Sequence, residues 1–210
     1  ILTEQRNILR GTEAVDRELR RLIGEETEKR IKQMASRLQE TLEKLKSQLP
    51  SEQQESLTEM KRLLEDRQIE RFSQSMKSLE QELAGNPDVH RLVTEMMRIA
   101  QALIPGKDEA MTKDSKGEFT GLSSRQKSLH EKTRELGDMV EMLSQLFPGL
   151  DTEIIKDLKN AAGSMDRASG KLAAEDAGAA IPLEEEAIQS LSRTQQSLQQ
   201  AAQQMAMRMQ

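Results

Sequence analysis

The chain has 210 residues, of which 32% are charged, and its formal net charge is -5 at pH 7. It contains no Cys, Trp or Tyr and only three Phe. The absence of Cys excludes a disulfide framework and thiolate chemistry, and the mild, interspersed charge argues against a nucleic-acid partner.

With so few aromatic residues, a core must be built from Leu, Ile, Val, Met and Ala, which suits narrow seams between helices. A charged chain that is rich in Leu, Ala, Glu, Lys and Gln and has helical periodicity is typical of a coiled coil or a helical bundle. The sequence therefore predicts an all-α protein with about six coiled-coil-like helices in an elongated bundle.

No run of residues approaches the roughly 18 apolar positions that a membrane helix needs, and no signal peptide is visible. The chain begins at Ile1 rather than at Met, and its helical pattern is already present at Leu2. We therefore expect a fragment of a longer protein whose anchors and targeting signals lie outside it.

The first helix is predicted over residues 2–49. On its polar face acidic residues precede basic ones by four positions, as at Glu13 and Arg17, which is the favourable order in a helix. Pro50 is expected to end it. Its apolar positions, mostly three, four or seven residues apart, are Leu2, Ile8, Leu9, Val15, Leu19, Leu22, Ile23, Ile31, Met34, Leu38, Leu42, Leu45 and Leu49.

A second helix is expected from Ser51 to about Leu83, with Ser51 and Gln54 forming a capping box. The pattern leaves open whether this helix breaks near residues 65–69. A third helix is predicted over residues 88–104.

Asn86 is placed to cap that third helix, with Pro87 at its first position. Residues 105–121 are polar, contain three Gly and lack apolar periodicity. They predict a flexible linker between an N-terminal helical unit, residues 1–104, and a C-terminal helical unit, residues 122–210.

The C-terminal unit is predicted to contain three helices that end in an αα-hairpin. Asp176 interrupts the pattern, Gly178 supplies backbone freedom, and Pro182 is tolerated if it lies in the first turn of the last helix. The three helices are expected at about Ser123–Leu146, from Asp151 or Thr152 to Glu175, and from Ala179 past Met205.

Two short segments share one pattern of a Gln, an aliphatic residue three positions later and a Thr seven positions later. They are Gln5-Arg-Asn-Ile8-Leu-Arg-Gly-Thr12 and Gln126-Lys-Ser-Leu129-His-Glu-Lys-Thr133. The two predicted units are either degenerate copies of one repeat or heptad sequences that match by chance.

The candidate chemical groups favour structural roles. His90 and His130 have no second His four residues later, so we interpret both as surface residues rather than metal ligands. Glu184-Glu-Glu186 is the densest carboxylate cluster. We place it in a first helical turn with nothing apolar around it to raise a pKa.

Other local patterns lack the spacing of a known site. Gly106-Lys107-Asp108 is not a phosphate loop, and residues 108–117 do not match a calcium loop. The basic residues Arg17, Arg20 and Arg21 alternate with acids and are interpreted as a solvated helix face. Met205, Met207 and Met209 form either an apolar patch for a partner or a frayed end. The sequence therefore predicts no catalytic, cofactor-binding or metal-binding residue.

One resemblance adds to this interpretation. The run from Ala161 to Met205 resembles the C-terminal helical hairpin of a bacterial domain-of-unknown-function family of large membrane-anchored envelope proteins, and the Gln5 and Gln126 segments resemble the helices before it. The residues that carry it are Ala161-Ala-Gly-Ser-Met165, Ala168, Leu172, Asp176, Ala180-Ile-Pro-Leu-Glu-Glu-Glu-Ala-Ile-Gln-Ser-Leu191 and the glutamines that follow. The resemblance implies membrane helices elsewhere in the parent protein and a location outside the cytoplasm. It brings no catalytic residues.

These observations predict a non-enzymatic interaction or spacer module of such an envelope protein, on the periplasmic or extracytoplasmic side of the inner membrane. Its partners are expected to be proteins, and membrane contact is expected only through a segment outside this chain. Two alternatives stay open: a cytoplasmic or phage-derived coiled-coil scaffold that is an obligate oligomer, and a lipid-binding amphipathic bundle. The second lacks the aromatic anchors typical of membrane interfaces. The oligomeric state is left open.

Overall fold

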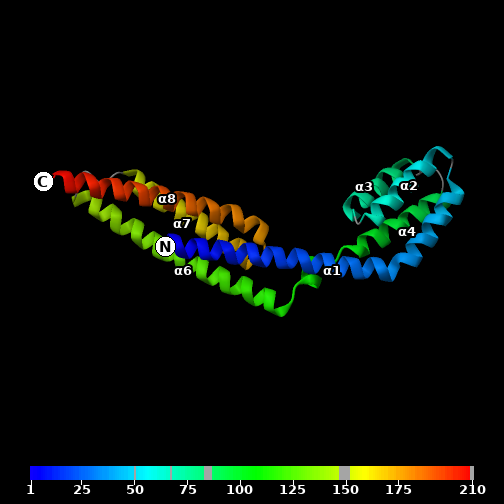
Figure 1. Cartoon of the computed structure of the whole chain (residues 1–210), viewed down its shortest axis with the longest axis horizontal. Helices are drawn as coiled ribbons and strands as arrows, with labels where there is room; N and C mark the ends of the chain where they lie inside the picture. Colours follow the sequence, from blue (N-terminus) through cyan, green and yellow to red (C-terminus); the bar gives the residue numbers. More distant parts are fainter. Residues whose placement is uncertain (50, 67, 83–86, 147–151, 209–210) are drawn as a thin grey trace. The chain divides into compact units, whose positions relative to one another are not determined.

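The computed structural model describes residues 1–49, 51–66, 68–82, 87–146 and 152–208. These residues form helices and no strand, which confirms the predicted all-α class. The described ranges contain eight helices rather than about six (Figure 1). They are α1 (Leu2–Gln48), α2 (Ser51–Glu65), α3 (Ile69–Glu82), α4 (Pro87–Leu103), α5 (Lys107–Ala110), α6 (Lys113–Leu146), α7 (Thr152–Ala173) and α8 (Ala177–Arg208).

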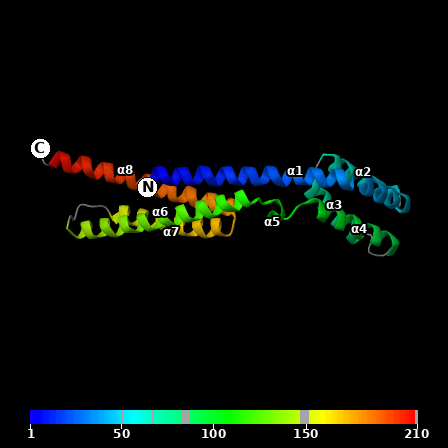
Figure 2. The same cartoon turned by 90° about the horizontal axis from the view of Figure 1, so that it is seen from below.

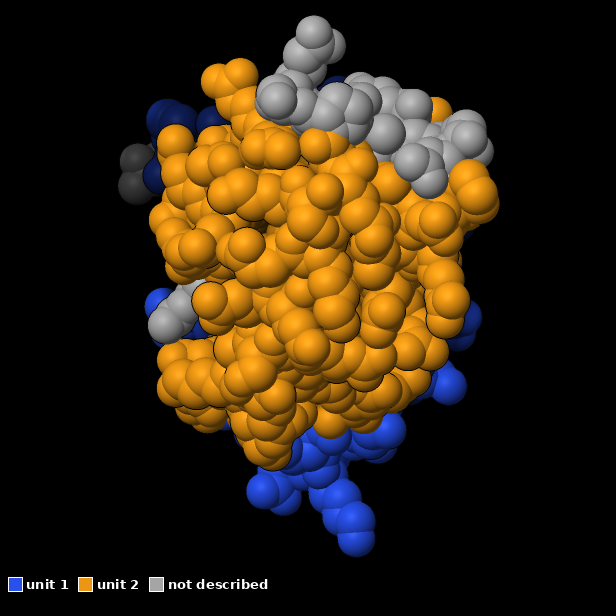
Figure 3. All heavy atoms as spheres, turned by 90° about the vertical axis from the view of Figure 1, so that its right-hand side faces the viewer, with its two compact units in different colours: residues 1–19, 111–210 blue, residues 20–110 orange. Residues whose placement is uncertain are grey.

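The chain forms two compact units, which are coloured separately in Figure 3. Unit 1 comprises residues 1–19 and 111–210, and unit 2 comprises residues 20–110. This division differs from the predicted one, because α1 contributes its first turns to one core and its remaining turns to the other. An amphipathic stripe shows that a helix is half-buried but not which helices bury it.

The prediction of an irregular linker over residues 105–121 is wrong, because α5 and the start of α6 lie there. The Oγ1 atom of Thr112 accepts a hydrogen bond from the backbone N–H of Ser115 at 3.1 Å, which caps the start of α6. Phe119 and Leu122 then bury their side chains in unit 1, with 1% and 7% of each exposed. This burial offsets the low helix propensity of the glycines between and before them.

The predicted second helix is divided into α2 and α3, at the break that the sequence pattern left open. Gln54 donates through Nε2 to the carbonyl oxygen of Leu49 at 3.2 Å, next to the end of α1. The helix α4 begins at Pro87, as predicted. The proposed stop at Pro50 and cap at Asn86 lie outside the described residues.

Unit 2 has an apolar core. In this unit α2 packs against α3, and α3 packs against α4 (Figure 1). The part of the surface seen in Figure 3 is closed by packed side chains. The core residues include Leu38, Leu45, Leu57, Met60, Phe72, Met76, Val93, Met96, Ile99 and Leu103, all with less than a tenth of their surface exposed.

Unit 1 is built from residues 1–19 of α1 together with α6, α7 and α8. The view in Figure 2 shows α6 and α7 side by side, and α7 also packs along α8. Hydrogen bonds between the helices set the antiparallel register of α6 and α7. The Oγ atom of Ser123 donates to the carbonyl oxygen of Ser169 at 3.0 Å, and Nδ1 of His130 lies 2.8 Å from the carbonyl oxygen of Ala162.

The corner between α7 and α8 is a tight helix-to-helix joint. Glu175 adopts a left-handed conformation with φ of 58°, and the N–H of Asp176 donates to the carbonyl oxygen of Lys171 at 2.8 Å. This is the Schellman pattern that ends a helix. The Oδ1 atom of Asp176 also accepts from the N–H of Ala179 at 3.1 Å, so the same residue caps α8.

The joint confirms that residues 161–191 form a helical hairpin, but it corrects two details. Glu175, not Gly178, has the left-handed backbone, since Gly178 lies inside α8. Because α8 begins at Ala177, Pro182 lies in its second turn rather than its first.

Candidate functional site

The core of unit 1 contains polar side chains with no exposed surface. We call this group the polar centre. Burying a polar group is unfavourable unless it forms hydrogen bonds, so each member requires a partner. The polar centre consists of Gln5, Thr12, Gln126, Thr133 and Glu184, each with 0% of its surface exposed.

Gln5 on α1 and Gln126 on α6 form a reciprocal amide pair. Nε2 of Gln5 donates to Oε1 of Gln126 at 3.1 Å, and Nε2 of Gln126 donates back to Oε1 of Gln5 at 2.9 Å. At the exposed edge of the same contact, Arg125 donates to Glu4 at 2.6 Å, and this hydrogen bond lowers the pKa of the Glu4 carboxyl. The two helices are therefore joined by matched polar groups in their buried seam.

The paired glutamines are the first residues of the two similar sequence segments. The last residues of those segments, Thr12 and Thr133, also have equivalent surroundings. The Oγ1 atom of each lies within hydrogen-bond distance of the carbonyl oxygen four residues earlier, 3.1 Å for Ile8 and 2.8 Å for Leu129. The similar segments thus lie in one unit and meet each other, whereas the sequence analysis placed them in separate units.

The second neighbour of each threonine differs in chemistry. The Oγ1 atom of Thr133 lies 3.4 Å from Sδ of Met165 on α7. The Oγ1 atom of Thr12 lies 2.9 Å from Oε1 of Glu184 on α8. A carboxyl group therefore occupies one of two otherwise equivalent positions in the core.

The hydrogen bonds of Glu184 do not fully offset the unfavourable free energy of burying its carboxyl. Its Oε1 contacts Thr12, but Oε2 is buried and has no hydrogen-bond partner among the described residues. Burial raises the pKa of the Glu184 carboxyl from 4.5 to about 7; the contact with Thr12 opposes this increase, and the charge of Glu13 adds to it. Desolvation of the charged form is the dominant cause.

The geometry around the Thr12 hydroxyl can accommodate a protonated Glu184. This hydroxyl has one hydrogen atom but two oxygen neighbours, the carbonyl of Ile8 and the carboxyl of Glu184. If Glu184 is charged, both neighbours compete for one donor. If Glu184 carries its proton, it donates to Thr12 and Thr12 donates to Ile8, so both contacts are satisfied.

The prediction that nothing apolar surrounds Glu184 is wrong. Glu184 lies two turns into α8, on the face that also buries Ala180, Ala187 and Leu191. The spacing of these four residues, four, three and four, is a core stripe, and it is the signal that identifies Glu184 as buried. Glu186, in contrast, pairs with Arg167 across the α7–α8 hairpin at 3.1 Å.

A second feature of unit 1 is a groove at the end where α1 begins, which we call the open-end groove. In Figures 1 and 2, α6, α7 and α8 continue past the start of α1. Its apolar lining consists of Ile1, Leu2, Leu136, Leu158, Leu191 and Leu198, and its rim carries Thr3, Arg6, Thr194, Gln195, Gln199 and Ala202.

Two leucines that continue buried stripes of the bundle are exposed, and one of them, Leu198, lines the open-end groove. The stripe of α6 passes through Leu129 and Leu136 to Leu143, and that of α8 passes through Leu191 to Leu198 at the same seven-residue spacing. Leu129 and Leu191 are 4% and 5% exposed, whereas Leu143 and Leu198 are 45% and 37% exposed. Each of these two stripes therefore passes from a buried to an exposed leucine.

The remaining sequence candidates do not converge on a site. His90 is exposed, and His130 is half-buried against the carbonyl of Ala162 rather than on the surface. The described ranges contain no group of three side chains able to hold a metal ion.

In the predicted basic face, Arg17 pairs with Glu13 at 3.9 Å and Arg21 pairs with Glu25. Met207 is 70% exposed, while the side chain of Met205 and all of Met209 lie outside the description.

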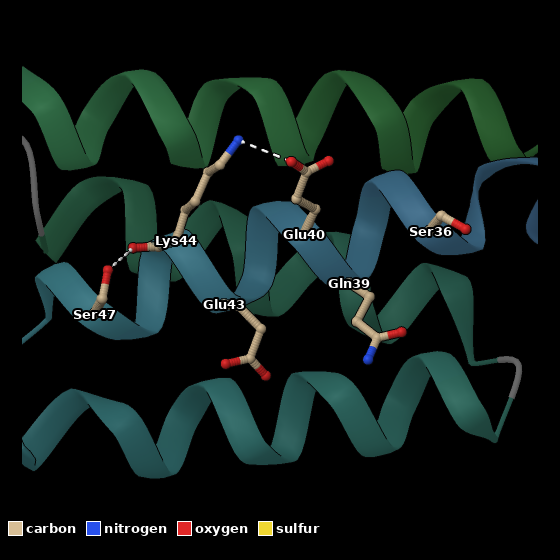
Figure 4. Close-up of a pocket in the computed structure, with 6 residues that line it drawn as sticks. All are labelled: Ser36, Gln39, Glu40, Glu43, Lys44 and Ser47. Carbon is tan, nitrogen blue, oxygen red and sulfur yellow. Dashed lines mark hydrogen bonds and ion pairs between the residues drawn. The ribbon is translucent and has the colours of Figure 1, made fainter.

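A hollow on unit 2 is lined by one helix alone (Figure 4). Its residues are Ser36, Gln39, Glu40, Glu43, Lys44 and Ser47, all on α1. Lys44 pairs with Glu40 at 3.4 Å, and Figure 4 shows Gln39 and Glu43 directed to the other side of the helix. These side chains diverge, so the hollow is a solvated helix surface.

Comparison with protein-family models, curated proteins and solved structures gives no match for this chain. Among the described helices, none is long and apolar enough to cross a membrane.

Proposed function

We propose that the chain is a non-enzymatic helical interaction or spacer module of a larger membrane-anchored bacterial envelope protein, and that its partners are proteins. The observation that carries this proposal is a group of large apolar side chains exposed on one face of α6, at Met139, Met142 and Leu143, with 54%, 69% and 45% of each exposed. A protein partner that packed on this face of α6 would cover these side chains.

The polar centre supports a structural role over a catalytic one. Glu184 has a pKa near neutrality, as a general acid requires, but its side chain is 0% exposed. A general acid must approach the proton acceptor of its substrate to within hydrogen-bond distance. A carboxyl with no exposed surface cannot do this unless the bundle opens.

The alternative of an obligate coiled-coil oligomer is less well supported. In such an oligomer the apolar stripes are buried by other chains. Here Ile8, Leu158 and Leu172 are 0–1% exposed within a single chain. The described residues thus bury a large apolar core within one chain.

Site-specific photo-crosslinking in cells that make the parent protein tests the interaction surface. A photoreactive residue at position 142 or 143 is expected to form adducts with an identifiable protein partner. The matched controls are positions 127 and 131, on the exposed face of α6. Equal crosslinking at the controls and at positions 142 and 143 would contradict the proposal.

Protease accessibility tests the location. We expect the chain to be cleaved by protease added to spheroplasts and to be protected in intact cells. Cleavage only after lysis of the spheroplasts would place it in the cytoplasm and support the alternative scaffold.

A further inference from the structure

We infer that the proton of Glu184 controls whether residues 1–19 of α1 stay packed in unit 1. While the carboxyl keeps its proton, this segment stays packed against α6 and α8. When the carboxyl loses its proton, the segment separates from the other helices of unit 1, and α6, α7 and α8 stay together. We call this separation the opening of α1.

The polar centre supplies the hydrogen bonds that join the core face of this segment to the other helices. Gln5 pairs with Gln126 of α6, and Thr12 lies 2.9 Å from Glu184 of α8. A buried polar residue stabilises packing only while its partner satisfies it. The positions that α1 buries in unit 1 are therefore sensitive to a change in the polar centre, because two of them are polar. These positions are Gln5, Ile8, Thr12, Val15 and Leu19.

Glu184 lies where α1 covers α8. Its one hydrogen-bond partner in the structure is Thr12 of α1, and its Oε2 atom has no partner among the described residues. A charged carboxylate in such a position is unfavourable, because too few donors replace the water that it has lost. When α1 leaves, water reaches the position that Thr12 occupied. The open state therefore accommodates the charged carboxyl better than the closed state does.

A neighbouring carboxylate makes α1 the helix that separates. Glu13 follows Thr12 on α1, and its charge raises the pKa of Glu184. Once Glu184 is also charged, the two carboxylates repel each other, and the repulsion acts between α1 and α8. Opening of α1 relieves both this repulsion and the burial of the charge.

The helices around Glu184 direct other titratable groups to partners of their own. On α6 these groups are an Arg and a His, and on α7 the group is an Arg that pairs with the exposed end of another glutamate of α8. The charge that acts on Glu184 from a neighbouring helix is therefore that of Glu13. The other pairs are Arg125 with Glu4, His130 with the carbonyl oxygen of Ala162, and Arg167 with Glu186.

Contacts that do not involve Glu184 hold α6, α7 and α8 together. Lys159 of α7 pairs with Glu141 of α6 at 2.9 Å, and Arg193 of α8 pairs with Asp157 of α7 at 3.1 Å. The tight joint at residues 173–177 also connects α7 to α8. The buried stripe of α7 includes the apolar residues Ile154, Leu158, Ala161, Met165, Ala168 and Leu172. Deprotonation of Glu184 leaves these contacts in place.

The direction of the pH dependence follows from the two states. In the closed state burial raises the pKa of Glu184 from 4.5 to about 7, whereas in the open state the hydrated carboxyl titrates near 4.5. Opening is therefore least favourable below pH 4.5, becomes more favourable as the pH rises to 7, and levels off above it. Between pH 4.5 and pH 8 the equilibrium constant for opening should increase on the order of 100-fold.

Native-state hydrogen exchange of the full chain, resolved by residue, tests this inference at a single pH. At pH 8 the amides of residues 8–15 should be at least tenfold less protected than those of residues 158–168, because they exchange through the opening of α1. Glu184→Gln keeps the side chain neutral and should raise the protection of residues 8–15 on the order of 100-fold. Glu185→Gln, at the exposed neighbouring position, is the matched control and should change this protection less than twofold.

Two results would overturn the inference. Equal protection of residues 8–15 and 158–168 in the wild type would mean that unit 1 opens only as a whole. Unchanged protection of residues 8–15 in Glu184→Gln would mean that the opening does not depend on this carboxyl. The wild type measured at pH 5 and pH 8, after division by the known chemical exchange rates, gives the same comparison without a substitution.

Discussion

The two units of this chain differ in what fills their cores. Unit 2 is packed with aliphatic and Met side chains around Phe72, and Thr41 is the only described polar residue buried in it. Unit 1 buries the polar centre and several serines in addition to its Leu and Ala residues. The same long helix, α1, contributes to both cores, so the difference lies in which side chains it presents along its length.

This contrast indicates different sources of structural specificity. An apolar core is tolerant of register, because one aliphatic side chain can replace another at modest cost. A reciprocal amide pair such as Gln5–Gln126 is satisfied in one register only. Unit 1 therefore specifies how α1 and α6 align, and unit 2 gains its stability chiefly from apolar burial.

The largest effect is expected from a cavity in unit 2. Phe72→Ala removes a fully buried ring and should lower the free energy of unfolding of unit 2 by about 4 kcal/mol. The loss should not depend on pH between 4.5 and 8, because no titratable group is involved. Hydrogen exchange resolved by unit measures it. A strongly pH-dependent loss would show that the apolar description of unit 2 is wrong.

The next effect is the pH dependence of unit 1. The folded chain holds the Glu184 proton up to a pKa of about 7, whereas the unfolded chain releases it near 4.5. The stability of unit 1 should therefore be greatest below pH 4.5, fall by roughly 3 kcal/mol as the pH rises to 7, and stay low above it. Glu184→Gln should abolish this fall and make unit 1 more stable than the wild type at pH 8. Denaturant unfolding across this pH range measures both.

The third prediction concerns the contribution of the Gln5–Gln126 amide pair to the stability of unit 1. Gln5→Leu leaves the amide of Gln126 buried without its partner and should destabilise unit 1 by about 2 kcal/mol. The double variant Gln5→Leu, Gln126→Leu removes both amides and should recover most of that loss. A double-mutant cycle on the unfolding free energy tests this, and additive losses would contradict a coupled pair.

The smallest expected effect on the free energy of unfolding comes from replacing a buried threonine, and one such threonine in each unit allows a comparison. Thr12 and Thr41 are both buried and both contact a carbonyl oxygen four residues earlier. Thr12→Val also removes the only hydrogen-bond partner that the structure shows for Glu184, so it should cost about 1–2 kcal/mol at pH 8. Thr41→Val should change unfolding by at most about 0.5 kcal/mol. Equal losses would mean that the polar centre makes no special contribution.

Local signals in the sequence predicted much of the fold. The start of α4 at Pro87 and the joint at Asp176 follow from capping chemistry that involves only neighbouring residues. Which helices pack against each other could not be predicted from such local signals. Gln5 and Gln126, for example, are 121 positions apart, and nothing in the residues around either indicates that the two side chains meet.

The predicted linker and Glu184 show that tertiary packing determines which segments are helical and which side chains are buried. Residues 113–121 look irregular because of their glycines, yet burial of Phe119 stabilises a helix there. Glu184 looked like a charged helix start because it precedes two further acids. Its burial depends on where α8 begins and on the position of Thr12 in another helix. The seven-residue stripes did extend through Leu143 and Leu198, but the pattern did not indicate that these residues are 45% and 37% exposed.

The most direct test of the difference between the two cores is the titration of the Glu184 side-chain carboxyl by carbon-13 nuclear magnetic resonance. The signal can be assigned by its absence in Glu184→Gln. A titration midpoint near 7 is expected for a carboxyl with no exposed surface and with one oxygen unpartnered. A midpoint near 4.5, the ordinary value for an exposed Glu, would contradict this account of unit 1.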